Sequence, residues 1–210
     1  AYLGQAAVGN TASSIKTYLN GLYNSGTPSN PAPSYILLIG DVAQLPAHQM
    51  SGHVSDLPFG EYNNDHFPEV YYGRFPAVDT TQLASMIEKT LDYEMYNIAD
   101  PNYLKRVVLV AGADNSYGPI HANGQINYIH QTYIDSTQGF DPLVHLYPTS
   151  SSEATQIRNQ VSEGAAIVNY TAHGSYSGWA NPSFTASHVP ALNNVGKYPL
   201  VITNACSTSE

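Results

Sequence analysis

The chain has 210 residues, 11% of them charged, and a formal net charge of −9 at pH 7. Only seven residues are Lys or Arg, which argues against nucleic-acid binding, because such binding needs a basic face. No apolar run reaches about 18 residues, so we expect no membrane span. The low charge content and the 17 Tyr residues favour a secreted or cell-surface protein over a cytosolic one.

Apolar runs typical of strands alternate with helical patterns along the first half of the chain. The predicted elements are a helix over 15–23, a strand over 35–41, a loop-rich stretch over 42–68, a strand over 69–75 and an amphipathic helix over 79–96. Asp79 or Thr80 is positioned to cap the last of these helices.

The second half continues the alternation. The predicted elements are a strand over 105–114, a helix over 126–134, a strand over 142–148, a helix over 151–164 and two strands over 165–174 and 198–206. Two capping boxes are conceivable before the helix over 151–164. Ser150 with Glu153 fits that motif better than Ser151 with Ala154.

The strands are rich in Val, Ile and Leu on both faces, and helices separate them. This pattern predicts an α/β fold with a mostly parallel sheet that is flanked by helices on both sides. The segment DPNY at 100–103 interrupts the alternation. We therefore expect two α/β subdomains, spanning 1–101 and 102–210.

Four residues of catalytic type follow the predicted strands directly: Asp41, Asp114, His173 and Cys206. In open α/β sheets, ligands bind at the carboxyl ends of the strands. Cys206 is the sole cysteine, so it forms no internal disulfide and is either an inert core residue or a reactive thiol. A Cys and a His at one sheet edge form a possible nucleophile and base, with a carboxylate to orient the imidazole.

Each of these residues also has a purely structural interpretation. Cys206 would suit a buried core, His173 a satisfied structural histidine, and Asp114 the cap of a loop. The combination favours catalysis, because Cys206 and His173 each close an apolar strand and Gly174 follows the histidine. A glycine at that place keeps side-chain atoms away from a backbone N–H.

A rival motif overlaps the same stretch. Residues 174–178 match G-x-S-x-G with Ser177 at the centre, which is the nucleophile elbow of serine hydrolases. That elbow needs a strand that turns at once into a helix, whereas the residues after 178 are typical of a loop. A serine hydrolase is thus the less favoured enzyme, and zinc hydrolysis is weaker still, because no H-E-x-x-H motif is present.

Several segments together resemble the gingipains, the C25 family of cysteine endopeptidases. They are NYTAHGS (169–175), YPLVITNAC (198–206), YLKRVVLVAGAD (103–114), YILLIGD (35–41) and NDHFPEVYYGRF (64–75), with the lysine-specific branch the more similar. The resemblance implies a caspase-like fold in two subdomains, with the catalytic site in the second. It also implies that the fold is incomplete at both ends of this sequence, so that a second chain or a further C-terminal segment would complete it.

Matched to the family pattern, Cys206 is the nucleophile, His173 the base and Asp114 the acid that orients His173. The backbone N–H groups of Gly174 and Cys206 then form the oxyanion hole. The resemblance implies hydrolysis of protein or peptide substrates through an acyl-enzyme. Arginine-specific relatives carry an acid where this chain has Gln125, so arginine preference is less expected, and the acidic net charge favours a basic residue at the cleaved bond.

A second site is indicated in the loop 63–69. Asn63, Asp65 and Glu69 alternate oxygen-bearing side chains, the Phe67 carbonyl adds another oxygen, and hard oxygen ligands at this spacing suit calcium. The resemblance implies a structural calcium ion here, with Asp41 joining from the preceding strand. The alternative is a solvated acidic loop, and Asn63 is a weaker ligand than Asp would be.

Two functions from different classes, and a third related to the first, are thus distinguished. The first is a calcium-stabilised cysteine endopeptidase. The second is a catalytically silent α/β module that binds peptides or surface partners. The third uses the same catalytic groups for processing or transpeptidation at the cell surface.

Overall fold

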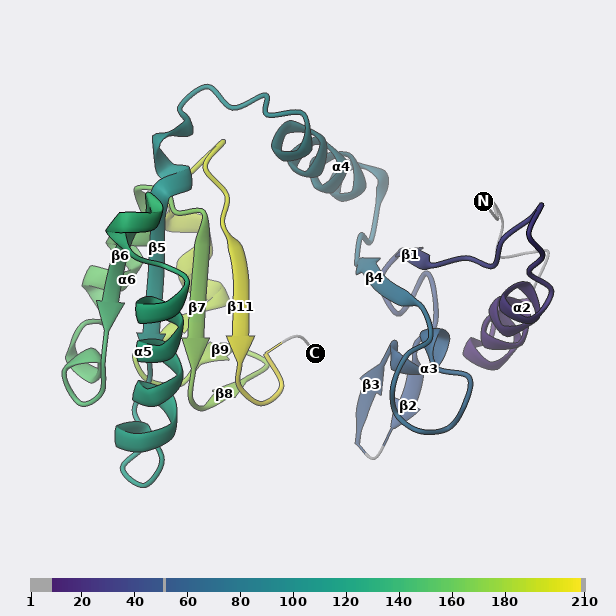
Figure 1. Ribbon diagram of the computed structural model, residues 1–210, viewed down its shortest axis with the longest axis horizontal. Coiled ribbons are helices and arrows are strands. Elements are labelled where there is room, and N and C mark those ends of the chain that lie inside the picture. Colours follow the sequence, from purple (N-terminus) through teal and green to yellow (C-terminus); the bar gives the residue numbers. More distant parts are fainter. Residues whose placement is uncertain (1–8, 51, 209–210) are drawn as a thin grey trace. The chain divides into compact units, whose positions relative to one another are not determined.

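The structure is a computed structural model that describes residues 9–50 and 52–208 (Figure 1). The chain forms two compact units, Ala1–Leu91 and Asp92–Glu210. The division predicted after residue 101 lies further along the chain than the boundary between these units.

The first unit contains two short sheets and their helices. Its elements are α2 (Ala12–Asn24), β1 (Tyr35–Ile39), β2 (His48–Met50), β3 (His53–Ser55), α3 (Leu57–Gly60), β4 (Tyr71–Phe75) and most of α4 (Thr80–Glu94). β1 and β4 pair in parallel, and β2 and β3 form an antiparallel hairpin. The stretch 42–68 was predicted to be loop-rich, yet it includes that hairpin and α3.

Two helix caps define where the helices of this unit begin. α2 starts earlier than predicted, because the Thr11 hydroxyl accepts the backbone N–H of Ser14 at 3.1 Å and the Ser14 hydroxyl accepts that of Thr11 at 3.3 Å. α4 begins as predicted, with the Asp79 carboxylate accepting the N–H of Gln82 at 2.8 Å. Asp79, rather than Thr80, is therefore the cap.

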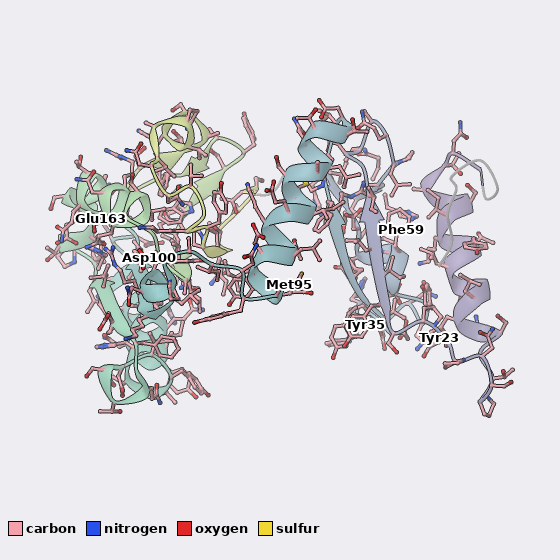
Figure 2. All side chains as sticks on the ribbon, turned by 90° about the horizontal axis from the view of Figure 1, so that it is seen from above. Tyr23, Tyr35, Phe59, Met95, Asp100 and Glu163 are labelled. Atoms are coloured by element: carbon pink, nitrogen blue, oxygen red, sulfur yellow. The ribbon has the colours of Figure 1, made fainter. Side chains whose placement is uncertain are left out.

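One face of β1 is buried in the first unit and the other is exposed. Its residue Leu38 packs with Ile15 of α2 and Phe59 of α3 in a small core (Figure 2). Successive strand residues point to opposite faces, so Tyr35 and Leu37 lie on the other face, where Tyr35 is 75% exposed. Tyr35 stacks there on Tyr71 of β4, with ring centroids 5.3 Å apart. This face of the sheet is apolar and exposed.

The second unit is built on a four-stranded parallel sheet. Its strands are β5 (Arg106–Ala111), β6 (Asp141–His145), β7 (Ile167–Thr171) and β11 (Leu200–Asn204), in the spatial order β11-β7-β5-β6 (Figure 1). The main helices are α5 (Asn123–Thr132) and α6 (Ala154–Ser162), and short strands β8 (Gly174–Ser175), β9 (Gly178–Trp179) and β10 (Phe184–Thr185) form a small antiparallel sheet. Short helical turns complete the unit: η1 (Pro101–Lys105), η2 (Gly118–Ala122), η3 (Ser136–Gln138), η4 (Thr149–Ser152) and η5 (Ala186–Ala191).

Helices cover both faces of the central strand β5, as predicted, whereas the edge strand β11 is exposed. Val108 and Val110 of β5 pack against Ile157 of α6 in one core cluster. The alternate residues of β5, including Leu109, pack with Ile126 of α5 in a second cluster. The fold is therefore the predicted mixed α/β class with a mostly parallel central sheet.

The capping box predicted before α6 is wrong. The Ser150 hydroxyl is buried and donates to the Ala111 carbonyl oxygen at 2.5 Å, which ties the chain to the end of β5. The Glu153 carboxylate instead contacts Nδ1 of the buried His145 at 2.7 Å. Both side chains found partners in neighbouring strands, so α6 starts without a side-chain cap.

Ion pairs lie at the amino ends of the parallel strands. Arg106, at the start of β5, contacts the carboxylate of Glu163 at 2.8 Å, and Lys197, before β11, contacts that of Asp100 at 3.2 Å. Figure 2 labels both acids. Exposed pairs of this kind contribute little to stability.

Among the described residues, no helix has the length and apolar character needed to cross a membrane.

The two isoleucines Ile126 and Ile120 test the importance of the α5 core. Ile126 is fully buried and Ile120 is 71% exposed. We expect Ile126→Ala to lower the free energy of unfolding by about 2–5 kcal/mol through lost burial and a cavity. Ile120→Ala should change it by less than about 0.5 kcal/mol. Urea denaturation followed by circular dichroism measures both, and equal losses would contradict this assignment of the core.

Candidate active site

Strand register brings three predicted residues to one edge of the sheet. Thr171, the last paired residue of β7, lies opposite Ala111 of β5 and Asn204 of β11. His173 and Cys206 each follow two residues beyond this paired row, on adjacent strands. Asp114 follows β5 on the other side of β7. A carboxylate, an imidazole and a thiol therefore come from three neighbouring strand ends.

His173 and Asp114 are in direct contact. Nε2 of His173 lies 2.9 Å from Oδ2 of Asp114. The side chain of Asp114 is only 15% exposed, whereas that of His173 is 64% exposed. Because the carboxylate occupies Nε2, Nδ1 is the ring nitrogen left to exchange a proton with a reacting group.

The other carboxylate oxygen of Asp114 is held by its own loop. Oδ1 accepts the backbone N–H groups of Tyr117 and Ser116, each at 2.8 Å. These N–H groups, with a smaller contribution from His173, hold the pKa of Asp114 below its ordinary value. The acid therefore stays ionised while Oδ2 faces the imidazole.

Cys206 is exposed, so the alternative of an inert buried cysteine is wrong. It lines an open cleft of about 370 Å³ that His173 and Asp114 also line. The remaining walls come from the ends of the same strands and from η2; they are Tyr117, Gly118, His121, Ala122, Thr171, Ala172, Asn204 and Ala205. The structure thus brings the predicted thiol, imidazole and carboxylate to one cleft.

Gly174 is required by close packing as well as by its place next to His173. A Cβ atom at this position would lie 2.5 Å from Cγ2 of Thr208 and 3.0 Å from Cβ of Ala205. The turn that carries Cys206 therefore packs directly on Gly174. A larger residue would displace that turn.

The N–H of Gly174 points away from β9. Ala180 donates to the carbonyl oxygen of His173 at 3.0 Å, so these two residues form a hydrogen-bonded pair of the β8–β9 ladder. Hydrogen-bonded and non-hydrogen-bonded pairs alternate in antiparallel ladders, which makes Gly174 and Trp179 a non-hydrogen-bonded pair. The backbone groups of Gly174 are consequently directed to the side opposite β9.

Tyr170, which sequence reasoning did not single out, supports the histidine from the core. Its hydroxyl donates to the carbonyl oxygen of His173 at 2.7 Å. Its ring is fully buried and stacks on Trp179, with centroids 4.3 Å apart and planes at 7°. Burial raises the pKa of Tyr170 to about 12. The backbone of His173 is thereby anchored to the hydrophobic core.

The serine-hydrolase motif does not form a nucleophile elbow. Residues 174–178 make the hairpin β8–β9, and no helix follows the strand. The Ser177 hydroxyl contacts the hydroxyl of Ser175 at 2.8 Å across the hairpin turn. Ser177 therefore lacks the strand-to-helix turn that this chemistry uses.

Gln125 lies in α5, next to the cleft walls. Its side-chain oxygen accepts the hydroxyl of Thr171 at 2.9 Å and Nδ2 of Asn204 at 3.4 Å. Thr171 and Asn204 both line the cleft. The side chain that contacts this wall of the cleft from α5 is therefore a polar, uncharged amide.

The loop 61–69 of the first unit concentrates carboxylates. Oε1 of Glu69 accepts Nδ2 of Asn63 at 2.7 Å, and Asp65 accepts the N–H of Phe67 at 2.9 Å. Sequence reasoning missed Glu61, which is 7% exposed and accepts the N–H of Asp65 at 3.1 Å. Within residues 9–50 and 52–208, no group of three or more His, Cys, Asp or Glu side chains forms a metal-binding cluster.

Asp41, the fifth predicted metal ligand, lies in the turn after β1. Its backbone carbonyl accepts the N–H groups of Gln44 and Leu45 at 2.9 and 2.8 Å. The approach of its carboxylate to the loop 61–69 stays a prediction.

Comparison with known proteins identifies relatives along the whole chain. The model of peptidase family C25 matches residues 5–210. Lys-gingipain of Porphyromonas gingivalis is 36% identical over 211 residues, which are all of this chain and 12% of that protein. Gingipain R2 of the same organism is 31% identical over 177 residues, which are 82% of this chain and 24% of that protein. The identity is higher with the lysine-specific branch, as predicted.

Solved structures agree with the sequence matches. One described as a protease superposes with a TM-score of 0.88 at 34% identity, covering 98% of this chain and 45% of the other. The crystal structure of the Arg-specific cysteine proteinase gingipain R superposes with a TM-score of 0.81 at 26% identity, covering 97% and 47%. The predicted caspase-like fold is confirmed, and this chain spans less than half the length of each solved relative.

Asp114→Asn tests the electrostatic role of the acid. The folded-state pKa lies below the ordinary value of 3.8, so the ionised carboxylate stabilises the fold above that value and the contribution is lost as pH falls through the lowered pKa. We expect Asp114→Asn to lower the urea midpoint at pH 7. The difference from the wild type should shrink below pH 3.8. A difference that does not depend on pH would refute the role of the ionised form.

Proposed function

This chain belongs to peptidase family C25, and from that premise we propose that it carries the catalytic site of a cysteine endopeptidase, a hydrolase of peptide bonds. The observation that carries the proposal is the cleft in which the sole cysteine lies with a His173–Asp114 pair. Because the relatives are much longer than this chain, the activity belongs to the whole protein of which these residues are part.

Cys206 acts as the nucleophile, and His173 takes its proton. Nε2 of His173 is bound to Asp114, so Nδ1 is the base, and Asp114 stabilises the imidazolium that results. The thiolate attacks the carbonyl carbon of the scissile bond and forms a tetrahedral intermediate. The C–N bond then breaks as His173 returns its proton to the leaving amine.

The developing oxyanion needs hydrogen-bond donors at its own position. Gly174 supplies one backbone N–H, which the ladder of β8 and β9 directs away from β9. The backbone N–H of Cys206 supplies the second. Water then attacks the acyl-enzyme with His173 again as base, which releases the acid product and restores the thiol.

Cleavage after a basic residue is the specificity that the chain favours. The relatives are named Lys-gingipain and an Arg-specific proteinase, and the net charge of −9 attracts cationic peptides. Gln125 is uncharged where arginine-specific relatives carry an acid, which favours lysine over arginine. Proteins or peptides are the substrates, and the site of action is outside the cell or at its surface.

Further polypeptide completes the fold in this proposal. β11 is one of the two edge strands of its sheet, and its consecutive residues Leu200, Val201 and Ile202 are all exposed. An exposed apolar edge strand is a place where another strand pairs. A second chain or a further segment would cover it.

A calcium ion in the loop 61–69 is the second part of the proposal. The donors are hard oxygens, as calcium requires: the side chains of Asp41, Asn63, Asp65 and Glu69 and the carbonyl of Phe67. Glu61 adds a carboxylate that is 7% exposed, and among the described residues its cationic neighbour is Lys16, at 3.7 Å. A divalent ion would balance this charge and fix the loop, and its role would be structural.

Replacing single catalytic groups tests the peptidase. We expect Cys206→Ala to abolish hydrolysis of lysyl peptides by the full-length protein without changing its circular dichroism spectrum. Asp114→Asn should lower kcat by roughly 10²–10⁴. Asp135→Asn is the matched control, because Asp135 also accepts two backbone N–H groups but lies in the turn after α5. Its activity should be that of the wild type.

The alternatives give different outcomes in the same assay. A silent binding module would show no hydrolysis in any variant while peptides still bound. A transpeptidase would join the acyl group to an added amine, which mass spectrometry of the products detects. Hydrolysis that survives Cys206→Ala would remove the thiol from the mechanism.

Calcium dependence is measured by thermal unfolding. We expect calcium at about 100 times its dissociation constant to stabilise the first unit by roughly 2.7 kcal/mol, and a chelator to reverse this. Glu69→Gln should remove most of the effect, whereas Glu88→Gln, a change on the exposed surface of α4, should leave it intact. An unfolding temperature that is the same with calcium and with chelator excludes the site.

A further inference from the structure

The loop that carries Asp114 is organised mainly by its own backbone. The N–H groups of Ser116 and Tyr117 bind the Asp114 carboxylate, and the N–H of Gly118 donates to the Asp114 carbonyl at 2.8 Å. Such a loop has a definite internal shape. Its orientation relative to the sheet needs a contact from outside the loop.

Tyr147, just after β6, makes two contacts of this kind. Its hydroxyl donates to Oδ1 of Asn115, the residue next to Asp114. Its ring lies under Gly118, which is buried: a Cβ atom there would be 3.1 Å from both Cγ and Cδ1 of Tyr147. The Tyr147 side chain therefore contacts the residue before and the residue after Ser116 and Tyr117, whose N–H groups bind Asp114.

The main chain of Tyr147 is itself fixed by Asn123, the first residue of α5. The N–H of Tyr147 donates to Oδ1 of Asn123 at 2.9 Å, and Nδ2 of Asn123 donates to the carbonyl oxygen of Tyr147 at 2.8 Å. Tyr147 is therefore hydrogen-bonded to both ends of the segment 115–123, to Asn115 through its hydroxyl and to Asn123 through its main chain. That segment includes Tyr117, Gly118, His121 and Ala122, which form one wall of the cleft.

We propose that Tyr147 is a positioning residue of the active site: its hydroxyl and ring fix the loop that directs Asp114 at His173. The inference rests on the proposed function, because it assigns Tyr147 a role through the catalytic acid. An ordinary structural tyrosine would stabilise the fold with no specific effect on the Asp114–His173 pair. The two roles are separable by experiment, since the phenol oxygen is removed in Tyr147→Phe while the ring and the bonds to Asn123 remain.

Alkylation of Cys206 by iodoacetamide is the measurement, because this is the sole cysteine of the chain and the reaction needs no substrate. The rate reports how well His173 and Asp114 promote the thiolate. We expect Tyr147→Phe to slow alkylation at pH 6–7 by about threefold to tenfold, as for the loss of one hydrogen bond. Tyr128→Phe is the control, because its hydroxyl contacts that of Tyr133 at 3.4 Å on the exposed surface of α5. Its rate should equal that of the wild type.

A double-mutant cycle separates positioning from general stability. Added to Asp114→Asn, the change Tyr147→Phe should have no further effect on the alkylation rate. In the full-length enzyme, Tyr147→Phe should lower kcat and leave KM nearly unchanged. Hydrogen exchange should accelerate at the N–H groups of Ser116 and Tyr117, which bind Asp114.

Four outcomes would overturn the inference. An equal slowing of alkylation by Tyr147→Phe with and without Asp114→Asn would make the tyrosine independent of the acid. Unchanged exchange at Ser116 and Tyr117 would show that the loop does not depend on the hydroxyl. If His173→Ala left the alkylation rate unchanged, both the proposed catalytic pair and the role of Tyr147 would be refuted. If His173→Ala slowed alkylation but Tyr147→Phe did not, only the role of Tyr147 would be refuted.

Discussion

The parallel register of β5, β7 and β11 is the constraint on which the site depends. Thr171 lies opposite both Ala111 and Asn204, so the residues that follow emerge at one level of the sheet edge. A shift of one residue in β11 would turn its side chains to the opposite face and would carry Cys206 away from His173. The register is in turn fixed by the core, because alternate residues of β5 pack on α5 and on α6.

Hydrogen bonds to backbone atoms and a buried aromatic ring support Asp114 and His173. Asp114 is held by two N–H groups of its own loop, and the carbonyl of His173 accepts the hydroxyl of the buried Tyr170. The ion pairs Arg106–Glu163 and Lys197–Asp100 lie instead at the amino ends of the strands, where exposure weakens them. The carboxyl edge is therefore kept in shape by short-range contacts that salt screens little.

The sequence predicted what depends on local pattern. The strands β5, β7 and β11, and the meeting of their ends at one cleft, followed from apolar runs that stop at Asp114, His173 and Cys206. Contacts between residues far apart along the chain did not follow from the sequence. Ser150 bonds to Ala111, and Tyr147 bonds to Asn115; no spacing rule connects such pairs, because the approach of β6 to the end of β5 creates them.

Small residues allow the three strand ends to pack closely at the edge of the sheet. A Cβ atom at Gly112 would lie 2.6 Å from Cβ of Ala172, and one at Gly174 would lie 2.5 Å from Thr208. Ala172 and Ala205 both line the cleft, next to His173 and Cys206 respectively. Proton transfer between a thiol and an imidazole requires hydrogen-bond reach, and bulkier residues beside them would force the strand ends apart. The glycine after the histidine thus allows close packing, because the space that it leaves is filled by the turn that carries Cys206.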